Sequence, residues 1–342
     1  MTERNEAPPG AGDEPLVLGL DVGGTSVRCL VATTGGRRLG TGAAPGANPN
    51  AVGMATALAH VGSAVTAALS GLDPARVAAA VMGAAGFAAH ADLGEDFGRV
   101  WDATGLRVRP RLVGDALVGF CAGTPARDGT IVLGGTGSGA VEVRDLREGL
   151  VRDAAGWLLG DDGSGQWVGR EAVRHAIRPG PAPQDPLAVA VRRALLGRPD
   201  GDRQDLVRTV YAGSPLLLST LAPVVVGLAR DGDPDAVRVL VDAARLLQRS
   251  VASVRRAGDT TPVVLVGGLF SSEVLLGALT ARLRRAWPDA PVLRGGSGAG
   301  GAAWLAVHDL AAQGWAGPTG PTLHAALTRL PLVVDAGRRT DE

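Results

Sequence analysis

A pair of short apolar runs joined by a glycine-rich turn occurs twice in this chain, once in each half. Residues 16–21 and 27–32 flank the first turn. Residues 130–133 and 140–143 flank the second turn, which reads Gly-Gly-Thr-Gly-Ser-Gly over 134–139. Short apolar runs around glycines are typical of β-hairpins. The repetition predicts an internally duplicated chain in which each half begins with a hairpin.

The remaining patterns alternate between strand and helix, and the 342 residues exceed one typical domain of roughly 150. We expect the following elements: a third strand over 37–41, a helix over 50–70, strands over 77–82 and 107–113, a helix over 234–256 that starts at Asp233-Pro234, and strands over 262–266 and 291–294. These elements predict an α/β fold with two lobes.

The lobes are expected over the following ranges. Residues 1–14 are acidic and rich in Pro and Gly, which favours a disordered tail. We assign 15–121 to the N-terminal lobe and 122–314 to the C-terminal lobe. Residues 315–342 are expected to return to the first lobe.

Composition excludes several mechanisms. All 34 basic residues are arginine, so the chain cannot supply the lysine of a P-loop, of a protein kinase or of a Schiff-base enzyme. The 34 acidic residues bring the formal charge to 0, which disfavours nucleic acid as a partner. Cys29 and Cys121 are the only cysteines, too few for a zinc-cysteine site or a disulfide framework. We expect a cytoplasmic protein.

Two uncharged stretches, residues 41–72 and 209–229, are long enough to raise the question of whether they span a membrane. Both are diluted by small residues, polar residues or proline, so we interpret them as helix and loop. The expected chain has no membrane segment and no signal peptide.

The two glycine turns are candidates for binding phosphate. Glycine lets successive backbone N–H groups converge on an anion, and the Thr and Ser hydroxyls add donors. The alternative is that the glycines only turn the hairpins. Asp21, directly before the first turn, could hold Mg²⁺, or it could simply cap the turn.

Asp115 is the candidate catalytic residue. It follows the strand predicted to end at residue 113 and lies between the two halves of the sequence. A carboxylate there could act as a base, although the alternative for Asp at such a junction is a helix N-cap.

An ordered set of motifs extends this interpretation: Leu18-Gly-Leu-Asp-Val-Gly-Gly-Thr25, Gly114-Asp115-Ala116, the glycines of 134–139, Gly156-Trp157, Gly160-Asp-Asp-Gly-Ser-Gly165 and Val266-Gly-Gly-Leu269. Over about residues 16–310 this set resembles the N-acetylglucosamine kinase and activase-type ATPase family, within the superfamily of sugar kinases, heat-shock 70 proteins and actin. The family usually has a longer segment between Trp157 and the acidic pair; the shorter form is similar to actinobacterial glucosamine kinases.

The resemblance implies two duplicated ribonuclease-H-like lobes of the actin-like ATPase type around a central cleft, with ATP and Mg²⁺ bound. It assigns Asp115 as the general base and Gly298 to Gly301 to the adenosine, while Asp21 is expected to hold the metal on the chemistry given above. A packing role is the alternative for this last run. ATP contacts are assigned to Gly23, Gly24, Thr25, Gly135, Thr136, Gly137, Gly267, Gly268 and Leu269.

The expected reaction is phosphorylation of the C6 hydroxyl of glucosamine, an amino sugar, by ATP. Carboxylates at Asp161 and Asp162 could favour the C2 ammonium over an N-acetyl group. The substrate set is Asp115, Gly137, Ser138, Trp157, Asp161 and Asp162. Gln166, Glu171 and His175 are further candidates for reading the C2 substituent. A homodimer is compatible with these expectations.

Three alternatives remain open. The sugar could be N-acetylglucosamine. An activase-type ATPase would need cysteines for a bridging iron-sulfur cluster, whereas Cys29 and Cys121 are more simply interpreted as buried apolar residues. The chain could also be a sensor that binds sugar or nucleotide without turnover.

Overall fold

The computed structural model describes residues 14–84, 94–178 and 184–329, which form two compact units. Unit 1 comprises the residues up to Pro125 together with those from Gly295 onward, and unit 2 spans Ala126–Arg294. The predicted tail lies outside the described residues, apart from residue 14, and so does the end of the return segment beyond 329. The described part of the return segment belongs to unit 1.

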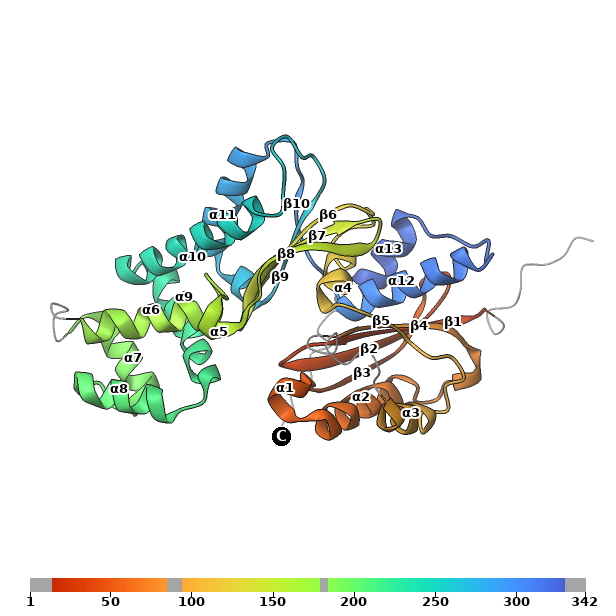
Figure 1. The fold of residues 1–342 in the computed structure, drawn as a ribbon, viewed down its shortest axis with the longest axis horizontal. Coiled ribbons are helices and arrows are strands. Elements are labelled where there is room, and N and C mark those ends of the chain that lie inside the picture. Colours follow the sequence, from red (N-terminus) through yellow and green to blue (C-terminus); the bar gives the residue numbers. More distant parts are fainter. Residues whose placement is uncertain (1–13, 85–93, 179–183, 330–342) are drawn as a thin grey trace, which may run out of the picture. The chain divides into compact units, whose positions relative to one another are not determined.

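Unit 1 is built on a five-stranded mixed sheet with the order β3-β2-β1-β4-β5 (Figure 1). Its strands are β1 (Leu16–Val22), β2 (Ser26–Thr33), β3 (Arg38–Pro45), β4 (Val77–Ala84) and β5 (Arg111–Val113). The first three strands run antiparallel to one another, and β4 and β5 run parallel to β1. The predicted hairpins are confirmed, but the strand expected over 107–113 forms only in its last three residues.

Unit 2 repeats this topology with the order β10-β9-β6-β7-β8. Its strands are β6 (Gly129–Gly134), β7 (Ser138–Arg144), β8 (Arg147–Asp153), β9 (Val263–Val266) and β10 (Val292–Arg294). Again the first three are antiparallel neighbours, and β9 and β10 run parallel to β6. Because each strand has its counterpart in unit 1, the predicted internal duplication is confirmed.

Helices cover both faces of the sheet in unit 1 (Figure 1). They are α1 (Pro49–Val52), α2 (Met54–Ala68), α3 (Gly94–Asp102), α4 (Asp115–Cys121), α12 (Gly298–Ala312) and α13 (Pro321–Thr328), with a short 3-10 turn at Pro74–Arg76. The single helix expected over 50–70 is interrupted at Gly53, whose φ of +80° does not fit a right-handed helix. The chain therefore restarts as α2.

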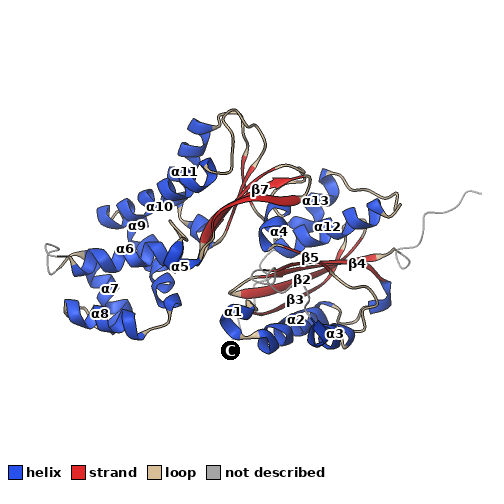
Figure 2. Ribbon diagram, in the orientation of Figure 1, coloured by secondary structure: helices blue, strands red, loops and turns tan. Residues whose placement is uncertain are grey.

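Unit 2 carries a larger helical part (Figure 2). Its helices are α5 (Gly156–Leu159), α6 (Gly165–Ile177), α7 (Pro186–Leu196), α8 (Arg203–Ala212), α9 (Ala222–Arg230), α10 (Pro234–Ala252) and α11 (Glu273–Ala286), with 3-10 segments η2 (Pro215–Leu221) and η3 (Gly268–Ser271). The predicted start of α10 is confirmed, because the Asp233 side chain accepts the Ala236 N–H and Pro234 occupies the first turn.

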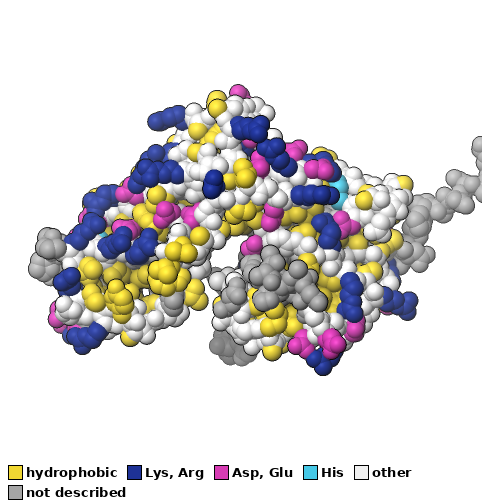
Figure 3. Space-filling view, in the orientation of Figure 1, with side chains coloured by type: hydrophobic (Ala, Val, Ile, Leu, Met, Phe, Trp, Pro, Cys, Tyr) yellow, Lys and Arg dark blue, Asp and Glu magenta, His cyan; other side chains and the backbone are white. Residues whose placement is uncertain are grey.

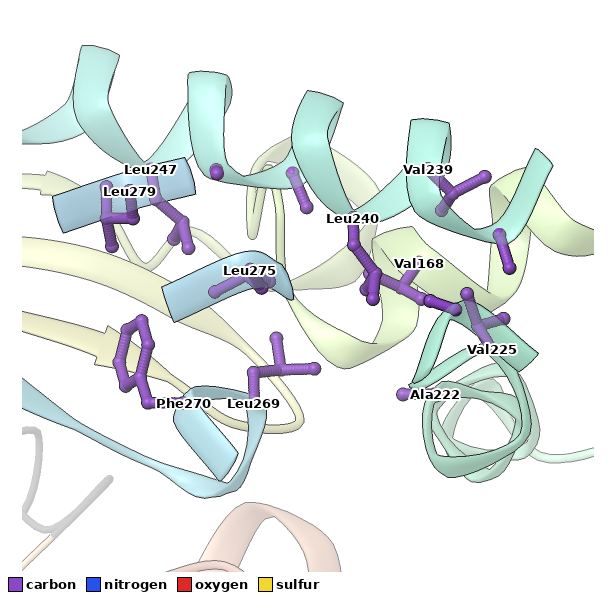
Figure 4. Close-up of a cluster of buried hydrophobic side chains, with 14 of the residues drawn as sticks. Val168, Ala222, Val225, Val239, Leu240, Leu247, Leu269, Phe270, Leu275 and Leu279 are labelled. Atoms are coloured by element: carbon purple, nitrogen blue, oxygen red, sulfur yellow. The ribbon is translucent and has the colours of Figure 1, made fainter. Parts of the chain in front are cut away.

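Each unit has its own hydrophobic core. In unit 2, Val168 of α6, Leu240 of α10 and Leu275 of α11 pack together (Figure 4). The guanidinium of Arg255 is fully buried, donates to the Thr130 hydroxyl at 3.0 Å and pairs with Asp259 at 3.2 Å. These bonds offset part of the cost of burying the charge, although the Arg255 Nε has no hydrogen-bond partner within the part of the chain that the structure describes.

The domain boundary at residue 314 predicted from the sequence differs from the structure, because α12 packs in unit 1. A Cβ added to Gly19 on β1 would stand 2.1 Å from the carbonyl oxygen of Ala299, so helix and strand meet backbone to backbone. Chain order places α12 after unit 2, whereas packing on the first sheet returns it to unit 1. The observed division is therefore at 294/295.

Candidate active site

Unit 1 places Asp21 and Asp115 at the same edge of its sheet. Asp21 is the sixth residue of β1, and Asp115 follows β5 after a single glycine as the first residue of α4. Because β1, β4 and β5 run parallel, their carboxyl ends meet at one edge, which is where ligands bind in open α/β sheets. Gly114, not Asp115, occupies the N-cap position of α4.

Both carboxyl groups have raised pKa values, and the charge of Asp115 contributes to the rise at Asp21. Burial and the nearby charge of Asp115 raise the pKa of Asp21 from its ordinary 3.8 to about 6, against an opposing effect of Arg28. Burial also raises the pKa of Asp115, and the backbone N–H groups of Ala116 and of Asp115 itself oppose this rise. The site therefore holds two acids that are more easily protonated than exposed aspartates.

The turn between β1 and β2 leaves room beside its backbone. The Gly23 N–H donates to Ser26 across the turn at 3.0 Å, while Gly24 and Thr25 are exposed. A Cβ at Gly24 would have no neighbour within 4 Å, and Gly24 does not have a positive φ. The fold itself therefore does not require glycine at this position.

The equivalent turn in unit 2 shows the same property at Gly135, where a Cβ would also meet nothing within 4 Å. The Gly135 carbonyl accepts the Gly165 N–H at 2.8 Å, and the Thr136 carbonyl accepts the Gln166 N–H at 3.2 Å. These bonds join the turn to the first residues of α6. The prediction from the sequence that the two turns are equivalent is therefore confirmed.

A segment that the sequence analysis missed holds the acidic pair in place. The Asp153 carboxylate accepts the backbone N–H of Asp161 at 2.5 Å and that of Asp162 at 2.8 Å. Asp153 and Asp161 both adopt positive φ, at 63° and 58°. Such a backbone is uncommon for non-glycine residues and occurs where surrounding contacts hold it. The only sequence signal is an aspartate at the end of a strand.

Asp161 and Asp162 have different surroundings. The Asp161 carboxylate accepts the N–H of Ser138 at 3.2 Å, and burial raises its pKa. Asp162 is exposed and forms no ion pair among the described residues. Ser138 is buried, and its hydroxyl donates to the Asp162 carbonyl at 2.9 Å, so this hydroxyl holds the acidic turn.

The residues predicted to read the C2 substituent fall into two groups. Asp162, Glu171 and His175 line one cavity of about 430 Å³, whereas Asp161 and Gln166 line a pocket of about 10 Å³. Within the larger cavity, Glu171 is paired with Arg174 and His175 with Asp185. Asp162 is the carboxylate of that cavity that lacks such a partner among the described residues.

Trp157 lies on α5 beside the acidic pair and is 43% exposed. Its neighbours Leu158 and Leu159 are 73% and 82% exposed, and Figure 3 shows hydrophobic side chains gathered at this position. An exposed indole next to carboxylates can pack against the apolar face of a sugar ring.

The strand end at β9 approaches the β6–β7 turn closely. Gly267 has a φ of +127°, and a Cβ there would stand 2.3 Å from the Gly134 carbonyl oxygen, so only glycine fits. Gly268 has open space beside it. The side chain of Leu269 is buried in the core (Figure 4), which leaves its backbone as the part that could meet a ligand.

The run from Gly298 to Gly301 packs within unit 1. A Cβ at Gly300 would stand 2.1 Å from the Leu327 carbonyl oxygen, and one at Gly301 would stand 2.3 Å from that of Val118. These glycines let α12 approach α13 and α4. Packing therefore accounts for Gly300 and Gly301, whereas the adenosine contact that the resemblance implied for this run stays a prediction.

Both cysteines are buried in unit 1 as free thiols. Burial raises the pKa of Cys29, and it raises that of Cys121 to about 12. An iron-sulfur cluster is held by thiolates, so neither residue fits a cluster that bridges two chains. Within the described ranges, no helix combines the length and the hydropathy that a membrane crossing needs.

The fold of the two units is that of known kinases of the α/β class. It matches the structure of a ROK family glucokinase from Streptomyces griseus that was solved with glucose and AMPPNP. That structure has a TM-score of 0.56 and 22% identity over 87% of this chain and its own full length.

The particular family follows from the sequence. Residues 18–306 match the BadF/BadG/BcrA/BcrD ATPase family, and the chain belongs to it. An N-acetyl-D-glucosamine kinase from Dictyostelium discoideum is 25% identical over 300 residues, which cover 81% of this chain and 93% of that protein. The structure of a candidate N-acetylglucosamine kinase from Chromobacterium violaceum has a TM-score of 0.70 and 25% identity, covering 86% of this chain and 99% of its own.

Proposed function

We propose that the chain is an ATP-dependent sugar kinase that phosphorylates the C6 hydroxyl of glucosamine and yields glucosamine 6-phosphate. The observation that carries the proposal is the pair of partly buried carboxyl groups, Asp21 and Asp115, at the carboxyl edge of the first sheet. Two relatives named as N-acetylglucosamine kinases, each covering more than four-fifths of the chain, support a hexosamine substrate.

Asp115 is the general base of the proposed reaction. It accepts the proton of the sugar hydroxyl while the hydroxyl oxygen forms a bond to the γ-phosphorus of ATP and the bond to the departing ADP oxygen breaks. A raised pKa suits this role, because a base works best when its pKa lies near the working pH.

Asp21 would hold the magnesium ion that accompanies ATP. Carboxylate oxygens are the ligands that this hard cation prefers, and Asp21 already experiences the negative charge of Asp115, so the donor set fits a divalent cation. When bound, Mg²⁺ neutralises charge on the β- and γ-phosphates.

The β1–β2 and β6–β7 turns bind the ATP phosphates in this proposal. Open space at Gly24 and Gly135 supports it, because a phosphate can come close to the backbone only where no side chain intervenes. The N–H groups there, with the Thr25 and Thr136 hydroxyls, act as donors. Gly267, Gly268 and the Leu269 backbone bind the adenosine.

Asp162 selects the amino sugar. It is exposed, it lacks an ion pair among the described residues, and it stands next to Asp161, whose carboxylate binds a backbone N–H. An ammonium at C2 gains a charge-assisted hydrogen bond there, whereas an N-acetyl group does not. Asp161, Ser138 and Gly137 hold this turn, and Trp157 packs against the sugar ring.

N-acetylglucosamine is the second candidate substrate, because both relatives carry its name. The discriminating experiment measures sugar-dependent ADP release with glucosamine, N-acetylglucosamine and glucose, each as kcat/KM. We expect glucosamine to give the highest value. A higher value for N-acetylglucosamine favours the second candidate, and ATP binding without ADP release with any sugar contradicts the kinase.

A further inference from the structure

Unit 2 contains a cluster of metal-ligating side chains that the proposed function does not use, namely His175, Asp185 and Asp235, and His175 lines the same cavity as Asp162. The His175 Nε2 lies 3.1 Å from each oxygen of the Asp185 carboxylate and 3.9 Å from Oδ2 of Asp235. One ligand atom from each residue lies within 4.8 Å of the others. The side chains are 13%, 14% and 27% exposed, so the cluster is largely shielded yet reachable from solvent.

The three residues come from separate elements that the fold brings together. His175 lies in the last turn of α6, Asp185 is the N-cap of α7, and Asp235 lies in the first turn of α10. Asp185 Oδ1 accepts the Ala188 N–H at 2.7 Å, and Asp235 Oδ1 pairs with Arg238 at 2.5 Å. An ionised carboxylate offers about four acceptor sites, so both aspartates retain capacity for a further ligand bond.

We propose that this triad binds a divalent transition-metal ion of the zinc class. One imidazole nitrogen and two carboxylate oxygens form a set that zinc accepts and that Mg²⁺, which prefers oxygen alone, does not. Zinc bonds of about 2.0–2.2 Å place tetrahedral ligand atoms roughly 3.3–3.6 Å apart. The separations of 3.1 and 3.9 Å from the His175 Nε2 bracket that range, and the three ligand atoms all lie within 4.8 Å of one another, so the aspartates would have to close in on a bound ion.

The fourth ligand is water. His175 lines the cavity of about 430 Å³, which gives solvent a route to the cluster. The bound ion joins α6, α7 and α10, and α6 begins directly after the acidic turn of Asp161 and Asp162. The site therefore stabilises the helical part of unit 2 and is independent of the magnesium proposed at Asp21, which belongs to unit 1.

The test titrates Zn²⁺ into the untagged, metal-stripped full chain and measures bound metal per chain by mass spectrometry and affinity by calorimetry. Co²⁺ reports the ligand geometry through its absorption spectrum. We expect one tight site in the wild type and in Asp21→Asn. The variants His175→Ala and Asp235→Asn should each bind at least about tenfold more weakly.

The matched control is Asp242→Asn, which removes a carboxylate that lines the same cavity but is outside the triad. It should bind Zn²⁺ as the wild type does. The proposal is overturned if the wild type binds no Zn²⁺ with defined stoichiometry, or if Asp235→Asn binds it as tightly as the wild type. The second condition applies even if His175→Ala fails to fold.

Discussion

A Cβ at Gly298 would stand 2.2 Å from Oδ2 of Asp21, so the first turn of α12 lies directly against the proposed metal-binding carboxylate. The same Cβ would stand 2.6 Å from Cγ and 3.1 Å from Cβ of Asp21, so a larger residue would have to displace this side chain. The glycine therefore serves the placement of Asp21 more than the packing of the helix.

Gly298→Ala should impair catalysis while the protein remains folded. The added methyl group displaces the Asp21 carboxylate, and a misplacement of about 1 Å in a catalytic constellation can cost about 100-fold in rate. Steady-state kinetics at varied Mg²⁺, with thermal melting, measures both effects. Gly277→Ala is the control, because it adds a methyl group to α11 with no atom within 4 Å. Equal activities of the two variants would contradict the role of Gly298.

Asp21→Asn should stabilise the ligand-free protein at high pH while abolishing activity. The folded state raises the pKa of Asp21 from 3.8 to about 6, so it holds this proton more tightly than the unfolded state does. Stability is therefore lost as pH rises through this window, by about 3 kcal/mol in total. The Asn side chain does not ionise, so the variant does not lose this stability.

Thermal melts of Asp21→Asn and wild type between pH 5 and 8 test this prediction without Mg²⁺ or ATP. The melting temperature of the variant should exceed that of the wild type at pH 8, and the difference should shrink as pH falls through about 6. A difference that stays constant across this range would show that Asp21 titrates normally.

Gly135→Ala should weaken ATP binding without loss of stability. The methyl group enters open space beside the β6–β7 turn, where the proposal places a phosphate, and it blocks one or two hydrogen bonds to a charged group. We expect at least about a tenfold increase in the Kd of ATP, measured by calorimetry. Gly227→Ala, in open space on α9, should leave the Kd unchanged.

Asp162→Asn and Asp161→Asn should have different consequences. Asp162→Asn removes the proposed partner of the C2 ammonium, so kcat/KM for glucosamine should fall about tenfold while that for N-acetylglucosamine changes little. Asp161→Asn weakens the bond to the Ser138 N–H and should lower the melting temperature. Parallel losses with both sugars in Asp162→Asn would refute its selective role.

The local parts of the fold could be predicted from the sequence. Apolar runs and glycine turns are short-range signals, and they located both hairpins and the start of α10. Repetition of the hairpin correctly indicated a duplicated fold. The break at Gly53 was missed because a single glycine can also be tolerated inside a helix.

The long-range contacts could not be predicted. Nothing adjacent to Gly298 in sequence indicates that its backbone meets Asp21, and chain order placed α12 in the wrong unit. The two hydrogen bonds by which Asp153 holds the acidic turn also depend on the folded arrangement, so the sequence did not indicate them. Nor did it indicate the burial of Arg255 against Thr130, because arginine is usually exposed.

The most direct test of the central claim is the turnover of Asp115→Asn, measured as ADP release with saturating glucosamine and ATP, beside ATP binding measured by calorimetry. We expect kcat to fall by about 10²–10⁴-fold, as for loss of a general base, while the Kd of ATP and the melting temperature stay close to those of the wild type. A kcat within a few-fold of the wild type would contradict the assignment of Asp115 as the base.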